Sequence, residues 1–152
     1  VTAATSSKIS DGAAATVLMS ADTAAELSVT PLARIVAHAT HSQESEWFTT
    51  APVGAVAKVL DKAGWSVDDV DLFEINEAFA AVTMAAMRDH DIPHDKVNVN
   101  GGACALGHPI GASGARLLVT LLNALAQRGL KRGVVSLCNG GGEATAIAVE
   151  RL

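Results

Sequence analysis

The sequence has no tyrosine, and aromatic residues make up only 3% of its 152 positions. This composition excludes a platform of aromatic side chains on which nucleic-acid bases stack. Basic residues are also scarce, because 11 Lys and Arg stand against 16 Asp and Glu and leave a formal net charge of −5. Without a basic footprint we expect no nucleic-acid partner.

Cysteine is equally rare, with two residues in the chain. Two cysteines do not make a disulfide framework, and they favour a reducing compartment, so we expect a cytoplasmic protein. The soft ligands Cys104, His108 and Cys138 and the pair His38 and His41 lack the spacing of known zinc motifs, so we expect no metal site.

Long apolar runs are missing too. The most apolar stretch, 117–126, is bounded by Arg116 and Arg128 and is too short to cross a bilayer, so we expect no membrane partner. No positively charged leader precedes an apolar run at the N-terminus. Because the chain begins with Val1 and not with Met, we expect a processed or truncated product.

What the sequence has is apolar residues and glycine. It is 49% hydrophobic and 18% charged, which excludes intrinsic disorder. Alternating strand and helix patterns predict an α/β fold with a mixed sheet, and Gly64 and Gly129 are expected to end two of the helices. Helices are predicted at 22–27, 53–63, 77–90 and 114–128, and strands at 12–20, 32–40, 70–75, 97–100, 134–138 and 144–149.

Three loops follow predicted strands, which is where α/β sheets place their sites. The first begins with Asn76. An asparagine at this place has two interpretations: it caps the following helix, or its amide positions a water molecule or a carbonyl group.

The second loop is rich in glycine and contains His108. Its glycines permit close backbone approach to a ligand, and a helix N-terminus follows, which favours anionic groups. The Lys-Ser/Thr pair of a nucleotide-binding P-loop is missing, so a P-loop is disfavoured. A lone histidine is often structural, but its small neighbours here leave the ring accessible.

The third loop starts at Cys138 and continues with three glycines, Gly140 to Gly142. Backbone donors near a thiol can lower its pKa and make it a proton shuttle. The alternative is a small apolar cysteine in a β-hairpin.

Together the three loops resemble the C-terminal part of the thiolase family, which includes acetyl-CoA acetyltransferases and 3-ketoacyl-CoA thiolases. The resemblance rests on three motifs in the family's order and spacing, and residues 6–20 resemble the segment that precedes the family's C-terminal domain. The motifs are NEAFA at 76–80, NGGACALGHPIGASGAR at 100–116 and CNGGGEATAIAVER at 138–151.

The resemblance implies acyl transfer between CoA thioesters by Claisen condensation or thiolysis, with CoA thioesters as substrates and no cofactor. By this resemblance His108 activates a nucleophilic cysteine, and Asn76 holds a water molecule that completes an oxyanion hole with His108. Cys138 moves the α-proton of the substrate, and the N–H of Gly140 contributes to a second oxyanion hole.

The resemblance also assigns the binding of CoA, to Ser7, Ala78 and Phe79. The family's nucleophilic cysteine lies in an N-terminal half that this sequence does not contain, so we expect the chain to be inactive in isolation. Residues 1–29 would then be the tail of that half and 30–152 the C-terminal domain, with a mixed five-stranded sheet and helices on both faces.

Apolar residues in the orphaned tail lead us to expect a homo-oligomer or association with an N-terminal thiolase half. The alternative function is a non-catalytic thiolase-like module for binding or assembly.

Overall fold

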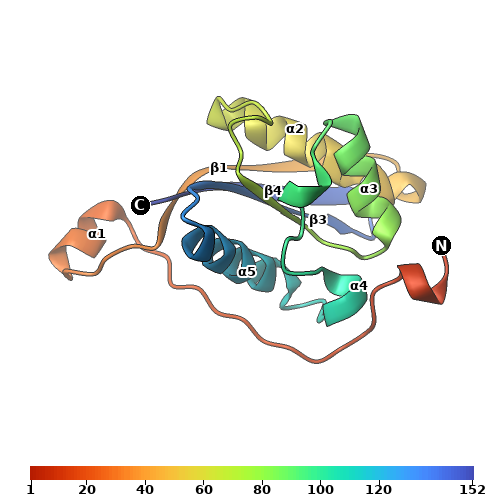
Figure 1. Cartoon of the computed structure of the whole chain (residues 1–152), viewed down its shortest axis with the longest axis horizontal. Helices are drawn as coiled ribbons and strands as arrows, with labels where there is room; N and C mark the ends of the chain where they lie inside the picture. The colour runs from red at the N-terminus through yellow and green to blue at the C-terminus, as the bar shows by residue number, and fades with distance from the viewer.

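The computed structural model describes all residues, 1–152, and contains one mixed four-stranded sheet (Figure 1). The spatial order is β1–β4–β3–β2, in which β2 runs parallel to β3 and the other two neighbouring pairs are antiparallel. The strands are β1 (Ala33–Ser42), β2 (Leu72–Ile75), β3 (Arg132–Asn139) and β4 (Glu143–Arg151).

Helices cover both faces of this sheet, which confirms the predicted α/β class. In Figure 1, α2 (Ala51–Ala63) and α3 (Ala80–Asp89) lie above the sheet, and α5 (Ser113–Arg128) lies below it. The remaining helices are short: α1 (Ala21–Glu26), α4 (Ala103–Leu106) and three 3₁₀ turns, η1 (Ala3–Thr5), η2 (Ser45–Thr50) and η3 (His94–Lys96).

Two apolar clusters hold these layers together. Leucines at four-residue spacing, Leu117, Leu121 and Leu125, form one face of α5, and they are buried against the sheet. On the opposite side α2 buries Val56, Val59 and Leu60. Neighbouring residues of one strand serve different clusters, because successive side chains of a strand point to opposite faces of the sheet.

The caps of the two long helices confirm the predicted role of glycine. Gly64 ends α2 and Gly129 ends α5, each in the left-handed region with φ of +67°. Glycine reaches this conformation without the steric cost that other residues pay. The last two strands, β3 and β4, form an antiparallel hairpin whose turn contains Gly140 and Gly142.

The prediction of a fifth strand at 97–100 is wrong. Val97 makes only an isolated parallel bridge with Phe73. Asn98 then adopts a left-handed φ of +48°. Its side chain, and not the backbone of a neighbouring strand, forms the hydrogen bonds to the backbone of Ile75. Its Oδ1 accepts from the Ile75 N–H at 2.9 Å, and its Nδ2 donates to the Ile75 carbonyl at 2.8 Å.

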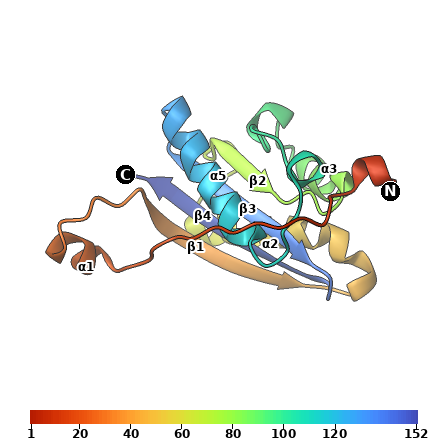
Figure 2. The same cartoon turned by 90° about the horizontal axis from the view of Figure 1, so that it is seen from below.

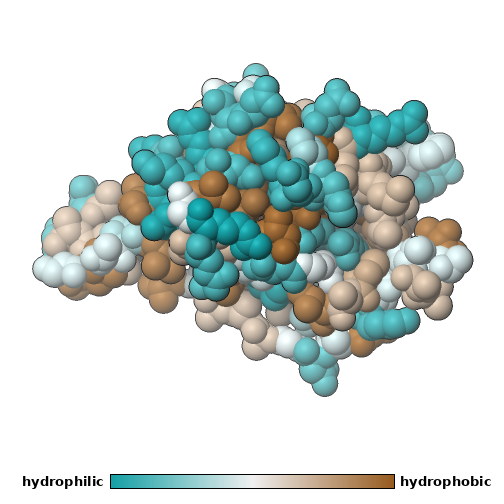
Figure 3. Space-filling view, in the orientation of Figure 1, coloured by the Kyte–Doolittle hydropathy of each residue, from teal (hydrophilic) through white to brown (hydrophobic).

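The strand predicted at 12–20 is also wrong, because this segment is extended but pairs with no other strand. It passes below α5 and leads to α1, which projects from the body (Figure 2). Val17 and Leu18 are 85% and 69% exposed. In the space-filling view, tan and brown residues of apolar character lie along this lower edge among teal, hydrophilic ones (Figure 3).

The helix predicted at 77–90 starts later, at Ala80, because Phe79 is still extended. Residues 41–50, which belong to none of the predicted helices and strands, contain the end of β1 and the turn η2. No helix in the structure has both the length and the apolar character that crossing a membrane requires.

Candidate active site

Asn76 and His108 meet at the carboxyl end of β2. Asn76 follows the last residue of β2 and is completely buried, and its Nδ2 lies 3.3 Å from Nε2 of His108. The helix-capping interpretation of Asn76 is wrong, because Phe79 is the N-cap of α3. The acceptor of the amide, Oδ1, is buried without a hydrogen-bond partner.

The loop around His108 is held on both sides. Before it, Gly107 has a φ of +95°, which favours glycine. The backbone N–H of His108 donates to the Lys8 carbonyl at 2.8 Å, so the N-terminal segment runs alongside this loop. After it, Nδ1 of the ring forms a hydrogen bond with Oγ of Ser113, the first residue of α5.

A charged pair lies beside this site. Glu74, two residues before Asn76, is buried, and its Oε2 lies 3.5 Å from Nη1 of Arg116 on α5. Burial raises the pKa of Glu74 to about 7, against the opposing effect of the Arg116 cation. Burial also lowers the pKa of His108, and the charge of Arg116 lowers it further. The imidazole is therefore held in its neutral form at neutral pH.

Cys138 lies at the same end of the sheet, near the end of β3. The parallel pairing of β2 with β3 places Ile75 opposite Ser136, two residues before Cys138. The thiol forms no hydrogen bond with His108 or Asn76, and alternation along β3 places it on the face of Val134, away from α5. Burial raises the pKa of the thiol.

The glycines after Cys138 differ in what surrounds them. Gly140 is exposed, and a Cβ built on it would meet nothing within 4 Å. Gly142 has a φ of +89°, and a Cβ there would lie 2.3 Å from the carbonyl oxygen of Gln43. Packing therefore requires glycine at position 142, whereas at position 140 packing would permit a side chain.

The residues expected to bind CoA come together although they are far apart in sequence. Both the N–H and the hydroxyl of Ser7 donate to the Ala78 carbonyl oxygen, at 3.1 and 3.0 Å. Ser6 forms an antiparallel bridge with Phe79, whose ring packs edge-on against Phe48 with centroids 6.3 Å apart. The N-terminal segment thus borders the same loop that carries Asn76.

Glu77 is a further residue of this region that the sequence did not single out. Its carboxylate accepts from Asn98 Nδ2 and from the Cys104 N–H, both at 3.1 Å, and so ties the Asn76 loop to the start of α4. Burial and the neighbouring Glu77 charge raise the pKa of Cys104, which disfavours a reactive thiolate there. Sequence analysis could not find this role of Glu77, because its partners Asn98 and Cys104 are remote in sequence.

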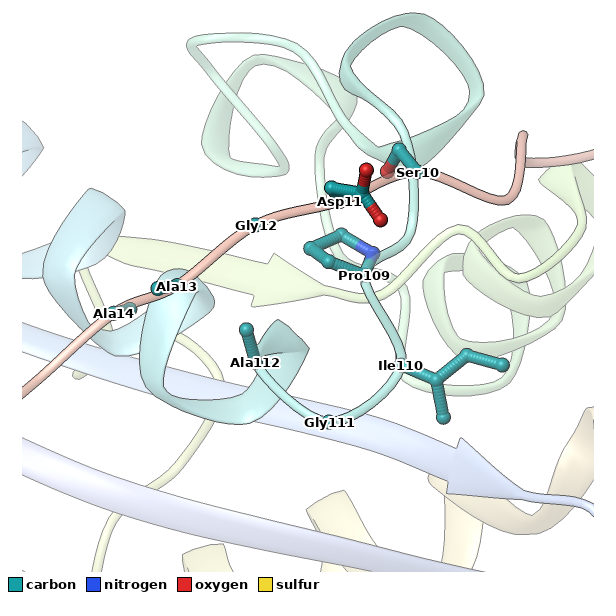
Figure 4. Close-up of a pocket in the computed structure, with 9 residues that line it drawn as sticks. All are labelled: Ser10, Asp11, Gly12, Ala13, Ala14, Pro109, Ile110, Gly111 and Ala112. Atoms are coloured by element: carbon teal, nitrogen blue, oxygen red, sulfur yellow. The ribbon is translucent and has the colours of Figure 1, made fainter.

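The N-terminal segment also borders a hollow of about 410 Å³ between residues 10–14 and the loop 109–112 (Figure 4). Gly12 permits this close approach, because a Cβ there would lie 2.7 Å from Cγ of Pro109. No group of three or more His, Cys, Asp or Glu side chains is placed to hold a metal ion.

Comparison with known families gives one match that covers most of the chain. The sequence model "Thiolase, C-terminal domain" matches residues 29–151.

Curated relatives of high identity extend over the whole chain. A probable acetyl-CoA acetyltransferase of Dictyostelium discoideum is 53% identical over 152 residues. An acetyl-CoA acetyltransferase of Chromobacterium violaceum is 54% identical over 151 residues. The chain spans only 37% and 38% of the length of these two relatives.

Solved structures share the fold. The acetyl-CoA acetyltransferase of Bacillus anthracis superposes with a TM-score of 0.97 at 46% identity, over all of this chain and 39% of that one. Human mitochondrial 3-ketoacyl-CoA thiolase, solved in complex with CoA, gives a TM-score of 0.92 at 39% identity, over all of this chain and 38% of that one.

Proposed function

Because the chain belongs to the thiolase family and corresponds to its C-terminal domain, we propose that it supplies His108 and Asn76 to an acyltransferase site that acts on CoA thioesters. The relatives it resembles are named acetyl-CoA acetyltransferase and 3-ketoacyl-CoA thiolase. The proposed reaction forms or cleaves a 3-ketoacyl-CoA, with CoA as the acyl carrier and no other cofactor.

The contact between Asn76 and His108 is the observation that carries this proposal. Forming an enolate from a thioester requires fixed donors at the developing oxyanion. The buried Oδ1 of Asn76 has no protein donor, so it can accept from a water molecule, which in turn can donate to a substrate oxygen. His108, held neutral by burial and by Arg116, can take the proton of a nucleophilic thiol through Nε2 and then donate it to the same oxyanion.

In this proposal Cys138 moves the α-proton of the substrate. Its thiol is half-buried at the same end of the sheet, and its raised pKa makes the thiolate, once formed, a stronger base. Gly140 is exposed in the following turn and unconstrained by packing, which suits an N–H that donates to a second oxyanion.

CoA would lie along the N-terminal segment. Ser7, Ala78 and Phe79 adjoin one another there, and the N-terminal segment pairs with His108 directly after Ser7, at Lys8 and Ile9. The structure of the human relative holds CoA by its own description. We assign the pantetheine arm to this region in the present chain.

The nucleophilic cysteine must come from outside these 152 residues. Cys104 and Cys138 are the only cysteines, and neither thiol forms a hydrogen bond with His108. The tail at 12–20 has exposed apolar residues that a partner can cover. This partner is an N-terminal thiolase half, which would supply the nucleophile, or a second copy of the chain. We propose a cytoplasmic location, where both thiols stay reduced.

A chimera tests the proposal. The chain replaces the matching 38% of the Chromobacterium violaceum relative, and cleavage of acetoacetyl-CoA by CoA is followed. We expect a folded, active chimera in which His108→Ala and Asn76→Ala each reduce kcat by about a hundredfold or more. Cys104→Ser is the matched control, because Cys104 is the other cysteine and has no role in the proposal.

The role of Cys138 needs a second measurement in the same chimera. Cys138→Ser should slow exchange of the α-proton of acetyl-CoA more than it slows acylation of the nucleophile. Equal losses in both would contradict its role in proton transfer. A folded chimera without turnover would instead favour the non-catalytic binding or assembly module.

A further inference from the structure

The two ring nitrogens of His108 have different partners, and both partners are side chains. Nδ1 contacts Oγ of Ser113, and Nε2 lies 3.3 Å from Nδ2 of Asn76. A neutral imidazole carries one proton, so one nitrogen donates and the other accepts. Which nitrogen holds the proton decides what His108 can do for a substrate.

The hydrogen bonds of Ser113 indicate the role of Nδ1. Its hydroxyl has a single proton, and Oγ lies 3.1 Å from the carbonyl oxygen of Pro109, which can only accept. With that proton given to Pro109, Oγ is left to accept, and the hydrogen bond with His108 requires a proton on Nδ1.

Asn76, on the other side of the ring, indicates the role of Nε2. Its Nδ2 is a donor without a lone pair for hydrogen bonding, so Nε2 must be the acceptor of this contact. The contact with Asn76 places the proton on Nδ1, and the contact with Ser113 agrees with it when the Ser113 hydroxyl donates to Pro109.

We propose that Ser113 is a positioning residue that holds neutral His108 as the Nδ1–H tautomer and directs the lone pair of Nε2 toward Asn76 and the reacting groups. If the proposed function holds, this tautomer is the one that can accept the proton of a nucleophilic thiol through Nε2.

The fold makes Ser113 a rigid acceptor. It is completely buried as the first residue of α5, and its backbone N–H also donates to the Pro109 carbonyl at 2.9 Å. The turn from Pro109 to Ser113 therefore fixes the distance between the histidine and the helix. Arg116, one helical turn further on, adds a cation that disfavours a second proton on the ring.

Long-range ¹H–¹⁵N correlation spectra of the ¹⁵N-histidine-labelled 152-residue chain test this directly. They are recorded at about pH 8, above the ordinary histidine pKa of about 6.5, so that the ring is neutral. The variant His108→Gln identifies the signals of His108 among those of the five histidines. We expect the wild-type pattern to be that of Nδ1–H.

Three variants define the role of the hydroxyl. Ser113→Ala should move the population toward Nε2–H, because Nδ1–H then loses its acceptor, and Ser113→Thr should restore the wild-type pattern. Ser10→Ala is the matched control, since Ser10 adjoins Gly107 in the same region but its Oγ has no hydrogen-bond partner.

A wild-type ring in the Nε2–H form overturns the inference whatever the variants do. An unchanged tautomer in Ser113→Ala that keeps its dispersed amide spectrum overturns it as well. The readout needs no turnover: an Nδ1–H ring in an inactive chimera would leave the inference standing and remove only the proposed function.

Discussion

Arg116 lies with Nη1 3.5 Å from Oε2 of Glu74, yet neither of these atoms forms a hydrogen bond. The pair joins α5 to β2, and Glu74 lies two residues before Asn76, which contacts His108. A buried pair with such loose geometry does not fully repay the cost of removing both charges from water. Its energetic signature is therefore a dependence of stability on pH.

Glu74→Gln should change the slope of stability with pH. In the native protein the pKa of Glu74 is raised from 4.5 to about 7, so between these values the folded chain keeps a proton that the unfolded chain releases. Stability from this group is present below about pH 4.5 and is lost as the pH rises through 7, about 3 kcal/mol in all. The glutamine variant should lack this loss in urea unfolding between pH 4.5 and 8.

Exposed Glu143 provides the control for that experiment, because Glu143→Gln changes the same chemical group without burial. Curves of unfolding free energy against pH that stay parallel for wild type and Glu74→Gln would show that Glu74 ionises in the folded chain as it does in water.

Arg116→Gln should raise the pKa of His108. Burial and the Arg116 cation both lower that pKa in the native chain, and the substitution removes the second cause. A lowered histidine pKa means that stability is lost as the pH falls below about 6.5, so the variant should also lose less stability in acid. The measurement is the NMR titration of the His108 ring, with Arg128→Gln at the far end of α5 as the control.

The predictable part of this fold is what local chemistry determines. Leucines at four-residue spacing define α5, and Gly64 and Gly129 end their helices in the left-handed conformation that few other residues adopt easily. The loops with Asn76 and Cys138 were also found correctly at strand ends, because their glycines and polar residues interrupt apolar runs, whereas the loop with His108 follows no strand.

The unpredictable part depends on partners remote in sequence. Val97 pairs as in a strand, but Asn98 then bonds the backbone of Ile75 through its side chain and ends the pairing. No residue next to Asn98 in the sequence indicates this. Asn76 looks like a helix cap until His108, 32 positions away, provides a different partner. The tail at 12–20 has the composition of a strand and lacks only a neighbour to pair with.

Gly142→Ala and Gly140→Ala should differ sharply in stability. A Cβ at position 142 meets the Gln43 carbonyl oxygen at 2.3 Å in a backbone with φ of +89°, so we expect a loss of about 1–3 kcal/mol. At position 140 there is space for a Cβ, and the loss should stay within about 0.5 kcal/mol. Urea unfolding of the two variants checks this, and equal losses would contradict the described turn.

Gly102→Ala should loosen the loop that carries Cys104 and His108. A Cβ at position 102 would lie 2.1 Å from Cδ of Glu77, so the carboxylate must leave its bonds to Asn98 and to the Cys104 N–H. The free energy needed to open this loop locally then falls. Each decrease of about 1.4 kcal/mol in that opening free energy makes the Cys104 thiol about tenfold more reactive.

Alkylation by iodoacetamide, followed by mass spectrometry of the peptides, measures Cys104 separately from Cys138. Gly111→Ala is the control, because a Cβ at that position of the same loop meets nothing within 4 Å. If Glu77 holds the loop, Cys104 should react faster only in Gly102→Ala, and Cys138 should react at its wild-type rate in both variants. Equal acceleration of both thiols would mean that the whole domain is destabilised, and unchanged rates would mean that the Glu77 contacts do not hold this loop.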